Sequence, residues 1–164
     1  MSSYSQAKIL IHENKDLVDH FGGASSELIA MGETKLGVQF PSDYRKFLLE
    51  YGALTFGAAE IYGVFTEDFE NSGVPDAVWA TLDERRVVKM PTNLVMIYNT
   101  EMGEILCLNY RELNTNQEPK ITSYFPGFAE SVQKNEVLYN SFGDFLLDIV
   151  EGELEPDLKL KCNT

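Results

Sequence analysis

Residues 33–64 read ETKLGVQFPSDYRKFLLEYGALTFGAAEIYGV, and this stretch predicts a helix, a second helix and a strand in that order. Gly37 is expected to end the first helix, because glycine adopts the left-handed conformation without steric cost. Pro41 presets φ at the start of the second helix, where its missing N–H is not needed, and Gly52 is expected to stop that helix. One apolar stripe runs along the second helix at helical spacing, formed by Tyr44, Phe47, Leu48 and Tyr51.

Further helices are predicted on both sides of this stretch. Apolar residues at helical spacing from Ala7 to Phe21 predict an N-terminal helix that Gly22-Gly23 ends. Ser25 or Ser26 is expected to cap the next helix. Two more helices are expected, one from Asp76 to about Val88 with Trp79 and Leu82 facing inward, and one after Ser141, where Asp144 completes a capping box and fraying follows Glu151.

Strands are predicted in three places. Residues 54–64 are expected to form one strand loosened by Gly57, and residues 93–99 and 104–110 a hairpin around the turn 100–103. Residues 120–125 predict a further strand, which Pro126-Gly127 breaks. This order of elements predicts an α+β fold, a central antiparallel sheet with flanking helices. We expect a single domain over residues 1–155 and a polar C-terminal tail over 156–164.

Three blocks of this sequence together resemble the SUKH superfamily, which includes yeast regulators of cell-wall glucan synthesis and many bacterial immunity proteins. The first block follows the pattern E-x-x-L-G-x-x-x-P-x-D-Y-x-x-F-L-x-x-x-G and a strand ending in Tyr-Gly, with matches at Glu33, Leu36, Gly37, Pro41, Asp43, Tyr44, Phe47, Leu48, Gly52, Tyr62 and Gly63. The second runs from Pro91 through Gly103 to Asn109 and is similar to the central hairpin of the family. The third, Ser141 to Leu146, is similar to its closing helix. The resemblance covers most of residues 25–150 and implies an α+β domain with helices around an antiparallel sheet.

Composition favours a folded protein of the cytoplasm. The 164 residues are 44% hydrophobic, which is ample for a core, yet no run approaches the roughly 20 apolar residues that span a bilayer. The N-terminus MSSYSQAKILIHENK lacks the basic start and continuous apolar core of a signal peptide. Cys107 and Cys162 form no C-x-x-C motif and are typical of reduced thiols. We therefore expect a cytoplasmic location.

Negative charge is the second informative feature of the sequence. The net charge is −13, and eight acids but no Lys or Arg lie between Phe47 and Glu84. Eight more acids lie between Ile121 and Asp157, against the single base Lys134. Such a surface repels nucleic acid and anionic membranes and attracts basic partners. The alternative is that the acidity serves solubility alone.

Residues suited to catalysis are nearly absent. His12 and His20 are placed on one predicted helix, about 12 Å apart along its axis, which is too far to share a metal ion. Cys107 lies between Leu106 and Leu108 and is expected to be a buried, inert thiol. Phosphate-binding glycine motifs are absent. The sequence predicts no enzyme, no cofactor and no metal site.

Two functional hypotheses remain. The resemblance implies an immunity protein that binds and neutralises a toxin domain, for example a nuclease, whose basic cleft an acidic inhibitor occupies. On this hypothesis the steering charges are Glu67, Asp68, Glu70 and Asp76. Trp79 is a candidate anchor, since Trp is enriched at binding hot spots, and the alternative for Trp79 is a core position. The second hypothesis is an intracellular adaptor or regulatory protein like the fungal relatives. Neither hypothesis fixes the oligomeric state.

Overall fold

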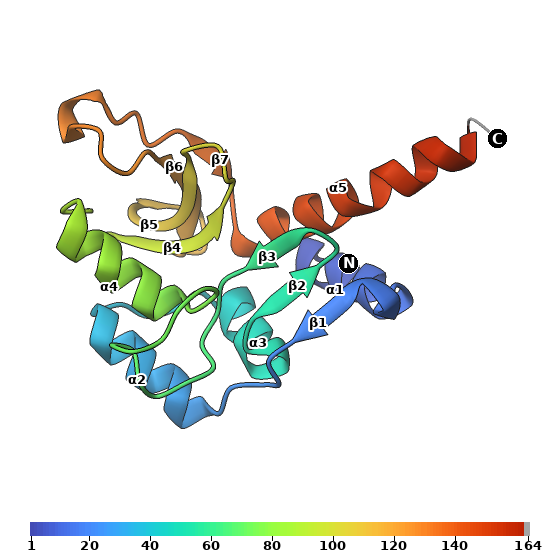
Figure 1. Ribbon diagram of the computed structural model, residues 1–164, viewed down its shortest axis with the longest axis horizontal. Helices are drawn as coiled ribbons and strands as arrows, with labels where there is room; N and C mark the ends of the chain where they lie inside the picture. Colours follow the sequence, from blue (N-terminus) through green and yellow to red (C-terminus); the bar gives the residue numbers. More distant parts are fainter. Residues whose placement is uncertain (163–164) are drawn as a thin grey trace.

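Seven strands form a single sheet in which every neighbouring pair is antiparallel (Figure 1). The computed structural model describes the backbone of residues 1–162 and the side chains of residues 1–155. The strands follow one another across the sheet in chain order. They are β1 (Val18–His20), β2 (Leu54–Phe56), β3 (Ala59–Ile61), β4 (Leu94–Asn99), β5 (Ile105–Leu113), β6 (Pro119–Tyr124) and β7 (Val137–Tyr139).

Helices cover both faces of this sheet, so the predicted α+β fold is confirmed. The helices are α1 (Ser3–Glu13), α2 (Ser26–Leu36), α3 (Ser42–Tyr51), α4 (Ala77–Val87) and α5 (Phe142–Cys162), with short 3-10 turns at Lys15–Leu17 and Glu130–Val132. Alternate residues of the central strands enter two separate cores. Val95 and Leu106 pack with α1, α3 and α5, whereas Met96 and Cys107 pack with α4. Because successive side chains of a strand point to opposite faces, β4 reads as a continuous apolar run.

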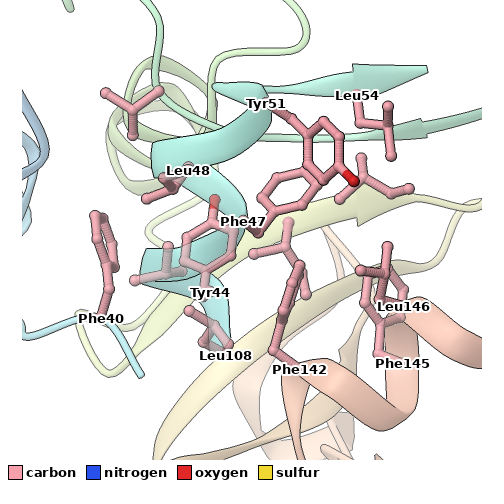
Figure 2. Packing of buried hydrophobic residues seen from close by; sticks show 14 of the residues in the cluster. Phe40, Tyr44, Phe47, Leu48, Tyr51, Leu54, Leu108, Phe142, Phe145 and Leu146 are labelled. Atoms are coloured by element: carbon pink, nitrogen blue, oxygen red, sulfur yellow. The ribbon is translucent and has the colours of Figure 1, made fainter. Parts of the chain in front are cut away.

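The predicted apolar stripe of α3 forms the centre of the larger core. Tyr44, Phe47 and Leu48 have no exposed surface, and Figure 2 shows Tyr44 and Phe47 beside Phe142 of α5. The aromatic rings pack edge to face or tilted, with centroids 4.8 Å apart for Tyr44 and Phe142. This is a favourable arrangement for aromatic pairs.

The predicted helix ends in residues 25–52 are confirmed. The Ser25 side chain caps α2 by accepting a hydrogen bond from the Leu28 N–H, and Gly37 ends α2 with φ +74°. Gly52 ends α3 with φ +72°. Glu33 holds the connection between the two helices, because its carboxylate accepts from the Phe40 N–H at 2.7 Å and pairs with Arg45 at 2.7 Å. Glu33, the first residue of the family pattern, therefore has a structural role.

Residues 14–21 differ from the prediction of one long N-terminal helix. Helix α1 ends at Glu13, where the Asn14 side chain donates to the Leu10 carbonyl. Residues 18–20 instead form the edge strand β1 beside β2. The apolar residues Leu17 and Val18 fit helical spacing, but Val18 pairs with Phe56, 38 residues further along the chain, and the Leu17 carbonyl accepts from the Gly57 N–H. Such tertiary contacts override local propensity.

Three other elements also differ from the prediction. The single strand predicted over residues 54–64 is instead the hairpin of β2 and β3 over residues 54–61, because Gly57 at φ +60° reverses the chain. Strand β7 was not predicted. Helix α5 continues to Cys162, whereas the sequence predicts fraying after Glu151.

The start of α5 differs from the predicted capping box. The Ser141 hydroxyl accepts from the Asp144 N–H as expected, but the Asp144 carboxylate accepts from the Ser3 hydroxyl instead of closing the box. The boundary between domain and tail at residue 155 stays a prediction.

Two glycines let three backbone segments cross at the end of α3. A Cβ on Gly63 would stand 1.7 Å from the Gly52 carbonyl oxygen, and a Cβ on Gly52 would stand 2.4 Å from the Gly22 carbonyl oxygen. Next to this contact the Val64 N–H donates to the Gly52 carbonyl at 2.8 Å. Only glycine permits so close an approach.

We expect Gly63→Ala to lower the free energy of unfolding by about 3 kcal/mol or more, because the added methyl group forces the crossing apart. Urea denaturation followed by circular dichroism measures the change. Gly152→Ala is the matched control, since a Cβ there meets nothing within 4 Å on an exposed helix position. That variant should gain about 0.5–1 kcal/mol. Equal stability of Gly63→Ala and the wild type would contradict the close contact.

Candidate functional site

The acidic segment between β3 and α4 is a loop whose two ends are fastened together. The Gly63 N–H donates to the Pro75 carbonyl at 2.9 Å, and the Ala77 N–H donates to the Gly63 carbonyl at 2.8 Å. Residues 64–75 therefore leave and re-enter the fold at one point, as in compact Ω-type loops. We call this segment the acidic loop.

The acidic loop exposes three carboxylates and buries one aromatic side chain. Phe69 is buried in the main core, whereas Glu67, Asp68 and Glu70 are exposed. The Asp68 carboxylate accepts from the N–H groups of Glu70 and Asn71 at 3.2 and 3.1 Å, which shapes the turn. Hydrogen bonds from the side chain and backbone of Asn71 lower the Asp68 pKa, so this group is ionised at neutral pH.

A groove of about 680 Å³ separates the acidic loop from α2. Residues 67–70 form one wall, and the other is formed by Glu27, Ala30, Met31, Thr34 and Lys35. Met31 is an apolar side chain exposed there. The groove thus combines an apolar surface with an acidic wall, which suits a basic side chain with an aliphatic stem.

Asp76 does not belong to this exposed set, contrary to the sequence-based hypothesis that it steers a partner. It has no exposed surface, and its carboxylate accepts from the N–H groups of Val78 and Trp79 at 2.9 and 3.0 Å. It is the N-cap of α4, the other role that the sequence predicted. Burial raises the Asp76 pKa, although the two backbone hydrogen bonds act in the opposite direction.

Trp79 lies at the edge of the acidic loop. The prediction that Trp79 and Leu82 face inward holds in part, because both are half-buried and pack against a core, Trp79 against the smaller one and Leu82 against the larger one. The buried positions of α4 are Ala77, Val78, Ala80 and Thr81. Trp79 is half-buried, packs against the smaller core and lines a shallow hollow of about 590 Å³ next to Phe69 and Glu70. The structure therefore brings Glu67, Asp68, Glu70 and Trp79 together on one side of the molecule and withdraws Asp76.

The two histidines line one cleft instead of one helix. His12 lies in the last turn of α1 and His20 in β1, and both border a cleft of about 680 Å³ with Lys8, Glu13, Glu50 and Tyr51. The sequence could not predict this cleft, because helical spacing placed both histidines on a single helix.

Among the residues that the structure describes, no cluster of three or more His, Cys, Asp or Glu side chains is arranged to hold a metal ion. Cys107 is fully buried, and burial raises the pKa of its thiol, so the unreactive form is favoured.

The fold and this surface define a class of protein: an α+β domain with a fastened acidic loop beside an open groove. The chain belongs to the SUKH_6 family, described as SMI1-KNR4 cell-wall, whose family model matches residues 26–146. The sequence-based resemblance to the SUKH superfamily is thereby confirmed. A comparison with curated proteins found no match. Within the described residues, no helix has the length and apolar character needed to cross a membrane.

Asp76 gives a prediction about stability and pH. Its pKa in the folded state is raised above the unfolded value, which is about 3.9. The stability that this shift contributes is present below the unfolded pKa and is lost as the pH rises through the folded pKa. Asp76→Asn keeps the capping oxygen but does not ionise. We therefore expect Asp76→Asn to gain stability relative to the wild type as the pH rises from acid to neutral.

Urea denaturation across this pH range measures the difference, and Asp76→Ala provides the control for the cap. We expect the alanine variant to lie about 1–2 kcal/mol below the asparagine variant at every pH, because it loses the acceptor. A difference between Asp76→Asn and the wild type that does not change with pH would show that Asp76 has an ordinary pKa.

Proposed function

We propose that this protein is a non-enzymatic immunity-type protein that binds and neutralises a toxin domain in the cytoplasm. The partner is a basic protein, of which a nuclease is one example, and the acidic loop attracts it. The observation that carries the proposal is the placement of Glu67, Asp68 and Glu70, all exposed on a loop fastened at both ends. Membership of the SUKH superfamily supports it, since many bacterial members resemble immunity proteins.

Electrostatics supports this partner. A nuclease exposes a basic cleft for phosphate, and an acidic protein competes for that cleft. Asp68 adds a carboxylate that stays ionised, and no Lys or Arg lies in the loop to offset it. Such fixed charges raise the association rate of a basic partner and repel nucleic acid itself.

An adaptor role without toxin binding is the second candidate. The description of the matching family as cell-wall favours it, because the yeast members regulate wall synthesis. An adaptor gives no reason for a fast, salt-dependent encounter with a toxin domain, so binding kinetics separates the two candidates.

The test identifies the genes beside this one and mixes the purified chain with the C-terminal domain of any large secreted protein that they encode. We expect a tight complex that abolishes toxicity. The triple variant Glu67→Gln, Asp68→Asn, Glu70→Gln should lower the association rate by about tenfold at low salt. The asparagine retains the acceptor oxygen for the Glu70 and Asn71 N–H groups, so the loop keeps its shape. Stopped-flow kinetics or surface plasmon resonance measures the rates.

The matched control removes three exposed carboxylates elsewhere with the same change in net charge, at Glu13, Glu112 and Glu151. It should change the association rate much less. At about 0.5 M salt, where the Debye length is roughly 4 Å, all three proteins should associate alike. Identical association rates of the wild type and the triple loop variant at low salt would show that the acidic loop does not steer the encounter. Absence of any complex would favour the adaptor role.

A further inference from the structure

Exposed apolar side chains lie close together in the chain on the connection between β6 and β7. Three are exposed there: Phe125, Phe128 and Val132. Phe128 and Val132 show the most surface, 64% and 61% of the residue. Single exposed apolar residues are ordinary, but three within eight consecutive positions of one connection are not. We call these three residues the Phe128 patch.

The loop that carries the patch is held in shape by one amide side chain. The Gln133 amide nitrogen donates to the carbonyls of Phe125 and Phe128 at 2.7 and 3.2 Å, and its oxygen accepts from the Phe125 N–H at 3.0 Å. The two phenylalanine rings lie edge to face, with centroids 6.3 Å apart. These bonds display apolar side chains toward solvent on an ordered frame, so little entropy is lost when a partner covers them.

Acidic side chains border the patch. Glu130 and Glu136 lie within the segment and are exposed, and Lys134 is its one base between residues 121 and 139.

We propose that the Phe128 patch is the anchor of the toxin interface, and that Phe128 enters an apolar pocket ringed by Lys and Arg on the toxin domain. This rests on the proposed function and adds the surface that holds the complex together once the acidic loop has steered the encounter. Charge complementarity selects this occupant. A second copy of this chain would bring two acidic rims and two net charges of −13 together, and an anionic membrane would be repelled in the same way.

The two surfaces therefore have different kinetic signatures. Helix α4 lies between the acidic loop and the β6–β7 connection in Figure 1. Exposed charges act mainly on the association rate, whereas desolvated apolar anchors act on the dissociation rate. Mutations in one surface should leave the rate governed by the other nearly unchanged.

The experiment measures both rates for the toxin domain with the double variant Phe128→Ser, Val132→Ser at physiological salt. We expect the dissociation rate to rise at least about 30-fold, as for loss of a binding hot spot, and the association rate to stay within about twofold. Gln133→Ala, which leaves the three apolar side chains of the patch in place but releases the loop, should give a smaller rise. The control Ile9→Ser, Leu49→Ser, Met102→Ser removes exposed apolar side chains elsewhere and should change neither rate.

Each outcome decides a different point. A complex with an unchanged dissociation rate in Phe128→Ser, Val132→Ser overturns the anchor and leaves the proposed function standing. No complex with the wild type overturns both. Dimerisation of the wild type in sedimentation at high salt, lost in the double variant, assigns the patch to a second copy and also overturns the anchor. Thermal unfolding of each variant confirms that these exposed substitutions leave the fold intact.

Discussion

The close approach of Gly52 and Gly63 is the constraint on which the rest of this structure depends. The backbone of Gly63 passes so near the Gly52 carbonyl that no side chain fits between them, and the chain at Gly22 closes the other side of Gly52. The end of α3, the exit of β3 and the segment before α2 are thereby fixed to one another. The hydrogen bond from the Val64 N–H to the Gly52 carbonyl then sets the direction in which the chain leaves the sheet.

The acidic loop inherits its geometry from this crossing. Gly63 hydrogen-bonds to Pro75 and Ala77, so the loop returns beside the point at which it left, and Asp76 begins α4 there. Phe69 pins the middle of the loop to the core, which leaves its charges on the outside. The Phe128 patch has a separate frame, the bonds of Gln133. The charges of the acidic loop and the apolar side chains of the Phe128 patch thus have separate supports in the fold.

The residues of the family pattern mostly build this frame. Glu33 joins α2 to α3 through the Phe40 N–H and Arg45. The Tyr44 hydroxyl donates to the Tyr62 carbonyl at 2.8 Å and links α3 to the exit of β3. Gly52 and Gly63 meet at the crossing. The proposed binding residues lie outside that pattern, as expected if members share a scaffold and differ in the partners that they bind.

The sequence by itself determined the features that depend on near neighbours. Ser25, Gly37, Gly52 and Asp76 mark helix ends because caps involve residues three or four positions away, and the apolar spacing of α3 marked the core. The tertiary structure alone decided the features that depend on distant partners. Residues 18–20 became a strand because β2 offered a ladder, β7 formed because β6 lay beside it, and His12 and His20 came to line one cleft. It also decided that Asp76 is buried while Glu67, Asp68 and Glu70 face solvent, since exposure is set by what packs above a residue and not by its neighbours in the chain.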